Sequence, residues 1–110
     1  MNDTTKNEVF ETDDEGFLLN LSDWSPAIAK TIAQREDIQI SEAHWEIIQI
    51  IKQYYSEYDH SPAMRPLVAY IKNNLAAEKA SSIYLMKLFP GSPAKLAAKI
   101  AGLPRPENCL

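Results

Sequence analysis

The stretch SEAHWEIIQIIKQYYSEY, residues 41–58, carries the clearest helical periodicity in the chain. The stripe of Ile47, Ile51, Tyr54 and Tyr58 recurs at i, i+4, i+7 and i+11, a spacing that lines one face of an α-helix. The aromatic side chains of the stretch fall on or beside the same face, which favours a place in the core over a surface for stacking bases. The stretch therefore predicts one long helix over residues 42–58, and a helical fold around it.

Four shorter helices are predicted on either side of the long one. Serine can cap a helix and proline is favoured at its first position, and these two residues adjoin at three of the predicted starts. The predicted ranges are 26–37, 62–76, 81–89 and 93–101. Pro66 would be the fifth residue of its helix, so a local distortion is expected there.

Both ends of the chain are predicted to be non-helical. Residues 8–20, EVFETDDEGFLLN, indicate a β-hairpin, because a glycine-containing turn separates two apolar runs; residues 1–7 are expected to be disordered. A glycine and two prolines end the last helix, so residues 102–110 are expected to form a mobile, extended arm. The predicted fold is mainly α (α+β): one domain, residues 1–110, built as a helix-turn-helix-like bundle of about five helices.

The single cysteine of the chain, Cys109, lies on this arm. Seven extended steps from Gly102 let its thiol travel on the order of 20 Å. A thiolate attacks sulfur readily, and a thiol on an arm suits a carrier that visits partners. The alternative is an incidental cysteine, because chain ends are often disordered and a lone cysteine is often only a small apolar residue.

The charges along the arm do not activate the Cys109 thiol strongly. Arg105 favours the thiolate, but Glu107 and the negative end of the preceding helix oppose it, so the expected pKa is near the ordinary value of about 8.5. Activation would come from docking, either in a partner or against basic residues of the chain itself. The candidate supporting residues are Arg105, Lys99, Lys95 and Arg65.

Several functional classes are not supported by the sequence. There is no phosphate-binding loop, nucleophile elbow or zinc-type Cys/His spacing, so no cofactor or metal is expected. His44 has no second ligand at metal spacing and is interpreted as structural. No apolar run approaches the ~20 residues of a membrane span, and the polar, acidic start is not a secretory signal, so a cytoplasmic protein is expected.

The charge is unevenly distributed. The net charge is −4, but residues 1–60 carry 4 Lys/Arg and 13 Asp/Glu, whereas residues 61–110 carry 7 Lys/Arg and 2 Asp/Glu. This asymmetry favours either a basic face that meets an anionic partner or two separately solvated surfaces. The overall acidity argues against a non-specific nucleic-acid binder.

Two stretches resemble a known family. Residues 88–110, LFPGSPAKLAAKIAGLPRPENCL, strongly resemble the end of the DsrC/TusE family, with its Leu-Phe-Pro, Pro-Ala-Lys and Lys-Ile-Ala-Gly-Leu-Pro-Lys/Arg-Pro pattern and penultimate cysteine. Residues 41–68 resemble the family's Thr/Ser-x-x-His-Trp segment, followed by Tyr-Tyr and Pro-Ala-Met-Arg. The resemblance covers nearly the whole chain.

The resemblance implies a function. The DsrC proteins of sulfite reduction and sulfur oxidation carry a second cysteine eleven residues before the penultimate one, a position that Ala98 occupies here. The chain is therefore similar to the single-cysteine, sulfur-relay branch of the family, a sulfurtransferase. By resemblance, Cys109 accepts a persulfide sulfur from a TusBCD-like complex and passes it to an MnmA-like tRNA 2-thiouridylase. Contact with tRNA would be through that acceptor, and the protein is expected to be a monomer without membrane contact.

Two other functions stay open at this point. A helix-turn-helix-like bundle with a basic second half could bind nucleic acid, in which case affinity would fall with rising salt whether or not Cys109 is present. A DsrC-like thiol adaptor or regulator of sulfur metabolism would instead associate with a sulfite reductase. The sulfur relay is preferred because it accounts for a lone thiol on a terminal arm.

Overall fold

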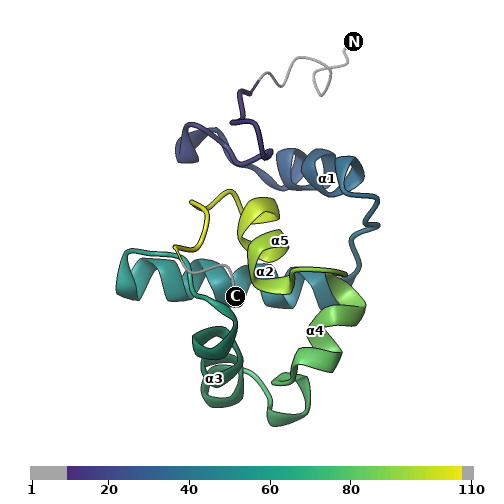
Figure 1. Cartoon of the computed structure of the whole chain (residues 1–110), viewed down its shortest axis with the longest axis vertical. Coiled ribbons are helices and arrows are strands. Elements are labelled where there is room, and N and C mark those ends of the chain that lie inside the picture. The colour runs from purple at the N-terminus through teal and green to yellow at the C-terminus, as the bar shows by residue number, and fades with distance from the viewer. Residues whose placement is uncertain (1–9, 108–110) are drawn as a thin grey trace.

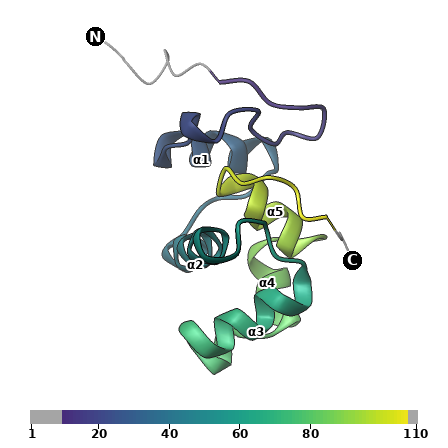
Figure 2. The ribbon, with the colours of Figure 1, turned by 90° about the vertical axis from the view of Figure 1, so that its left-hand side faces the viewer.

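The computed structural model describes residues 10–107 as a bundle of five α-helices with two short 3-10 turns (Figure 1). Two views agree that α1 lies at one end of the long axis, α3 and α4 at the other, and α2 and α5 between them (Figure 2). The elements in chain order are η2 (Leu21–Asp23), α1 (Pro26–Arg35), α2 (Glu42–Tyr58), α3 (Met64–Asn74), η3 (Ala77–Lys79), α4 (Ser82–Leu88) and α5 (Pro93–Ile100). The predicted five-helix, mainly α bundle is confirmed.

The long helix α2 has the predicted bounds, and its predicted face is buried except at the last residue. Ile47 and Ile51 are fully buried and Tyr54 is nearly so, whereas Tyr58, predicted on the same face, is 52% exposed because the helix extends past the core there. His44, in the first turn, accepts a hydrogen bond at Nδ1 from the Ser41 backbone N–H (3.0 Å), and its Nε2 donates to the Leu88 carbonyl (2.8 Å). His44 is therefore structural, as predicted: it caps the start of α2 and satisfies a free carbonyl at the end of α4.

Helix α5 is the centre of the bundle, because it packs against α1, α2, α3 and α4. Its buried side chains are mostly small: Ala97 and Ala98 are completely buried, as is Ala101 at the C-cap. Alanine lets neighbouring helices approach closely, so a helix of eight residues can contact four others. Larger apolar side chains from the surrounding helices, among them Phe89, Leu67 and Leu85, fill the remaining space.

The predicted start of α3 is wrong. The helix begins at Met64 instead of Pro62, and Pro62 is fully buried in the preceding loop. Pro66 is therefore the third residue of the helix instead of the fifth. The backbone N–H groups of the first turn have no partner within a helix, so proline is accommodated there, and α3 continues to Asn74 without the expected distortion.

The predicted β-hairpin over residues 8–20 is also not supported. The part from residue 10 onward contains one isolated antiparallel bridge, between Thr12 and Leu18, and no strand. The Asp13 carboxylate accepts hydrogen bonds from the Glu15 and Phe17 backbone N–H groups and closes a tight turn. Two residues after the bridge, Asn20 caps a 3-10 turn, so the second arm of the hairpin has no length in which to pair. Residues 1–9, including the part expected to be disordered, lie outside the described residues.

The uneven charge of the sequence is largely paired within the molecule. Four ion pairs between described residues each join a cation of the second half to a carboxylate of the first: Lys79 with Glu46, Lys95 and Arg105 with Glu15, and Lys99 with Glu36. Much of the basic half therefore faces the acidic half. The sequence suggested either a basic face for an anionic partner or two separately solvated surfaces. Neither interpretation included these ion pairs within the molecule.

The His44 contacts lead to a stability prediction. His44→Ala removes the cap of α2 and leaves the Leu88 carbonyl without its donor, so we expect a loss of about 2–4 kcal/mol in the free energy of unfolding, measured by urea denaturation. His60→Ala, at the exposed second histidine, is the control and should cost less than about 1 kcal/mol. Equal losses for the two variants would contradict this role of His44.

Candidate functional site

The first half of the C-terminal arm lies on the body of the protein. Leu103 is buried and Pro106 is fully buried, whereas Pro104 and Arg105 between them are exposed. The Ser61 hydroxyl donates a hydrogen bond to the Pro104 carbonyl and fixes the arm to the loop before α3. The arm predicted to leave the body at Gly102 therefore follows it through Pro106, because proline and leucine supply apolar surface to bury. Cys109 lies outside the described residues.

Trp24 fixes the point at which the arm begins. Its indole N–H donates to the Ile100 carbonyl at the end of α5 (2.8 Å). Its ring packs directly on the backbone of Gly102, which has φ of +76°. A Cβ atom at this glycine would lie only 2.3 Å from Trp24 Cδ1. Both the positive φ and the missing side chain are therefore required for the arm to turn here.

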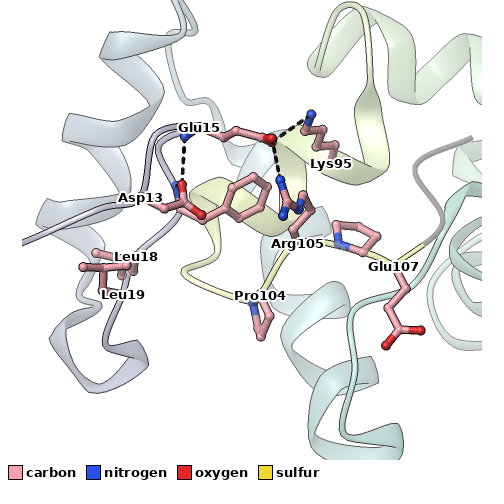
Figure 3. Close-up of a pocket in the computed structure, with 10 residues that line it drawn as sticks. Asp13, Glu15, Leu18, Leu19, Lys95, Pro104, Arg105 and Glu107 are labelled. Atoms are coloured by element: carbon pink, nitrogen blue, oxygen red, sulfur yellow. Dashed lines mark hydrogen bonds and ion pairs between the residues drawn. The ribbon is translucent and has the colours of Figure 1, made fainter.

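Glu15 connects the N-terminal turn to the arm (Figure 3). One of its carboxylate oxygens lies 3.1 Å from Lys95 Nζ on α5, and the other accepts a hydrogen bond from Arg105 on the arm. We call these three residues the Glu15 clamp. Lys95 and then Arg105 hold the pKa of Glu15 below its ordinary value of 4.5, so the clamp is formed at neutral pH and is lost as acidification protonates Glu15. Exposed ion pairs are weak, so the clamp can open.

The clamp borders a surface pocket of about 680 Å³. Figure 3 shows Glu15, Lys95 and Arg105 meeting on one side of it, with Glu107 on the other. The remaining lining includes Asp13, Leu19 and Pro104. The pocket is lined by an exposed leucine and by two cations that are already paired with a carboxylate. It can therefore hold the arm reversibly, and another anion can take the place of Glu15.

The structure brings together two of the four predicted supporting residues. Lys95 and Arg105 share Glu15, as described above. Lys99 is only 7% exposed and pairs instead with Glu36 (2.7 Å), with its ammonium group 5.4 Å from the Phe17 ring. Arg65 is exposed on the first turn of α3 and does not line the pocket.

Sequence reasoning missed the role of Glu15. The run Asp13-Asp14-Glu15-Gly16 falls in the turn predicted within residues 8–20, and acidic residues in turns are usually solvated. Glu15 is in fact opposed by two cations from a segment more than 75 residues away. The charge asymmetry between the halves indicated that ion pairs could join them, but it did not identify which residues pair.

The described residues give no sign of a metal centre or a membrane anchor. Across residues 10–107, no group of three or more His, Cys, Asp or Glu side chains could hold a metal ion. None of the helices in this range has both the length and the apolar character needed to cross a membrane.

Comparison with known proteins identifies the family. A family model described as "DsrC like protein" matches residues 4–110. The chain belongs to the DsrC-like family. It is 48% identical to sulfurtransferase TusE of Photorhabdus laumondii, over 94% of this chain and 93% of the relative, and 50% identical to sulfurtransferase TusE of Sodalis glossinidius, over 90% and 92%. The family resemblance found in the sequence is confirmed.

Solved DsrC structures have the same fold. The NMR structure of Allochromatium vinosum DsrC superposes with a TM-score of 0.82 at 44% identity, over 92% of this chain and 90% of that one. The names of the DsrC-like relatives also support the sulfur-relay role expected from the sequence, a sulfurtransferase that works with other proteins. They do not specify a donor or an acceptor.

The contact between Trp24 and Gly102 leads to a paired prediction. Gly91 also has a positive φ, +97°, but a Cβ atom there would meet nothing within 4 Å. Gly91→Ala should therefore cost only the backbone strain, about 1 kcal/mol of unfolding free energy. Gly102→Ala should cost about 2 kcal/mol more, because Trp24 must also move. Urea denaturation of both variants tests this, and equal costs would contradict the contact.

Proposed function

We propose that this DsrC-like protein carries sulfur as a persulfide on Cys109, accepting it from a TusBCD-like donor and passing it to an MnmA-like tRNA 2-thiouridylase. The supporting observation is the identity of 48–50% to proteins named sulfurtransferase TusE, in a chain that has one thiol. Thiolation of tRNA would take place in the cytoplasm, the location expected from the sequence.

The proposed transfer consists of two exchanges at sulfur. The Cys109 thiolate attacks the outer sulfur of a donor cysteine persulfide; the donor S–S bond breaks, and the donor cysteine leaves as a thiolate. An acceptor thiolate then attacks the outer sulfur of the Cys109 persulfide, and Cys109 leaves as a thiolate. One sulfur atom moves at each step, so no external oxidant or reductant is needed.

In this proposal the Glu15 clamp responds to loading. A persulfide is more acidic than a thiol, so loaded Cys109 is anionic at neutral pH. This anion can replace Glu15 on two of the supporting residues, Lys95 beside the arm and Arg105 on it. Lys99 and Arg65 contribute less, because Lys99 is buried with Glu36 and Arg65 lies away from the clamp.

Two observations disfavour the alternative functions. A DsrC-like adaptor that forms an intramolecular disulfide needs a second cysteine, but Ala98 occupies its position and is fully buried in the core. A nucleic-acid-binding surface needs unpaired cations, but four of the seven in the second half pair with carboxylates of the first half.

Replacing the thiol tests the proposed carrier. After incubation with a cysteine desulfurase, cysteine and the TusBCD-like complex, we expect intact mass spectrometry to show a gain of one sulfur atom that reductant reverses. Cys109→Ser should show no gain and no tRNA thiolation, while its circular dichroism stays that of the wild type. A variant that still supports thiolation would overturn the proposal, and so would a wild-type chain that takes up no sulfur.

Changing Glu15 tests the role of the clamp. Glu15→Gln removes the charge that neutralises Lys95 and Arg105, so their attraction for the thiolate rises and the pKa of Cys109 should fall. The pH dependence of the iodoacetamide alkylation rate measures this shift. Asp14→Asn makes the same charge change one residue away and should shift the profile less. Identical profiles for the two variants would contradict the role of the clamp.

A further inference from the structure

Helix α4 has an apolar face that the core does not use. Leu85 is fully buried, whereas Ile83 and Met86, one turn apart on the other face, are 71% and 44% exposed. Among residues 10–107, Ile83 has the largest exposed fraction of all large apolar side chains. The solvent face of a helix is normally polar, so an exposed apolar pair on one favours contact with a partner.

The exposed pair continues into the surface beside the arm. A depression of about 300 Å³ over α4 shares Ser82 and Met86 with a second one, of about 230 Å³, that reaches the arm at Pro106. Lys95 and Pro106 line this second depression and also the pocket at the Glu15 clamp, so the surfaces are continuous. We call the two depressions together the α4 surface; its lining includes Met64, Ile83, Met86, Lys87, Lys95 and Pro106.

The α4 surface is within reach of the terminal thiol. Three extended steps from Pro106 carry the Cα atom of position 109 no more than about 11 Å. Figure 2 shows the arm with α5 on the side of the molecule opposite α2, and Pro106 on this arm lines the α4 surface. A protein seated on the α4 surface therefore lies next to the end of the arm, where its own cysteine can meet Cys109.

The charged side chains that line the α4 surface are cations. Lys87 and Lys95 line it, whereas no carboxylate of residues 10–107 does. Lys87 forms no ion pair with the described part of the chain, and neither does Arg65, which follows Met64 at the start of α3. Carboxylates on a partner are therefore attracted to this surface, and no described acidic residue lining it opposes them.

The α4 surface fits a protein better than a nucleic acid. Isoleucine and methionine suit packing against another apolar side chain, and methionine adapts to partners of different shape. An apolar centre with charges at its edge is the usual arrangement of a protein interface. A phosphate backbone would pair with the cations but would leave Ile83 and Met86 without an apolar contact. The matching ligand is a protein surface with an apolar side chain flanked by carboxylates.

We propose that the α4 surface docks the protein sulfur donor, which packs an apolar side chain on Ile83 and Met86 and places carboxylates near Lys87 and Arg65. This inference rests on the proposed function, in which a donor and an acceptor each exchange sulfur with Cys109. The acceptor holds tRNA where the sulfur is delivered, so its surface there is basic and is repelled by cations beside the arm. The donor has no polyanion to hold, so an acidic surface is compatible with its role.

Two substitutions on the α4 surface test the proposal. Ile83→Ser removes the apolar contact and Lys87→Glu reverses a charge; both side chains are exposed, so the fold is retained. Both are made in the full chain carrying Cys109→Ser, so that binding is measured without sulfur transfer. We expect each to weaken binding to the TusBCD-like complex about tenfold by biolayer interferometry.

Matched controls make the same chemical changes elsewhere. Leu21→Ser replaces an exposed leucine of η2, and Lys30→Glu reverses an exposed charge on α1, at the opposite end of the molecule from α4 (Figure 1). Both controls should bind the donor as the unmodified chain does. Equal losses in the controls and the α4 variants would overturn the proposal, because the donor would then respond to overall charge and polarity.

The remaining outcomes distinguish the donor from other occupants. A loss of affinity confined to the MnmA-like enzyme or to tRNA overturns the proposal in favour of that ligand. Unchanged donor affinity in both α4 variants also overturns it. If Ile83→Ser leaves donor affinity unchanged but speeds up alkylation of Cys109 by iodoacetamide without a partner, the α4 surface holds the chain's own end instead.

A separate measurement keeps the docking site apart from the proposed function. Loading of Cys109 from inorganic polysulfide, in chains that keep the thiol, needs no docking and should be equal in all variants. If Cys109 cannot be loaded from either source, the proposed function fails, and the binding result still decides whether the α4 surface docks the complex. A chain that loads from polysulfide but does not bind the donor overturns the docking proposal alone.

Discussion

The close packing of α5 against four other helices is the constraint on which the structure depends. A helix of eight residues can hold this position because alanine dominates its buried face, and each alanine lets a neighbouring backbone approach. The same helix supplies Lys95 to the clamp and ends at the carbonyl that Trp24 binds. The geometry of the arm is therefore a consequence of core packing. Ala98, which is completely buried, belongs to this packing.

Electrostatics then joins the two halves of the chain. Each ion pair between described residues links the acidic first half to the basic second half, so the charge asymmetry of the sequence is mostly an internal complementarity. The buried Lys99 shows why such pairs are specific: a lysine that is only 7% exposed needs a carboxylate close to its ammonium group. Lys52 shows the opposite case, because its surroundings are partly apolar and no carboxylate of residues 10–107 is paired with it.

The helices were predictable from the sequence, whereas the contacts that shape the site were not. A period of 3.6 residues and serine-proline starts are local signals, so α2 was predicted to the residue and the other helices to within a few. The hairpin failed because Asp13 and Asn20 close local turns that compete with strand pairing. Glu15 was missed because its partners are remote in sequence. Cys109 was found through its chemistry and the family pattern, and its role stays a prediction because it lies outside the described residues.

The burial of Pro106 limits how far the end of the arm can extend toward a partner. With Pro106 seated, only two residues lie between it and position 109, so three extended steps carry the Cα atom of that position no more than about 11 Å from the anchor. A partner with a shallow catalytic cleft could work within this radius, whereas a deep cleft would require the partner to detach Pro106 and Arg105 first. The free energy needed to bring the thiol into a partner's cleft would then increase with the depth of that cleft, and it would differ between a shallow-cleft and a deep-cleft partner.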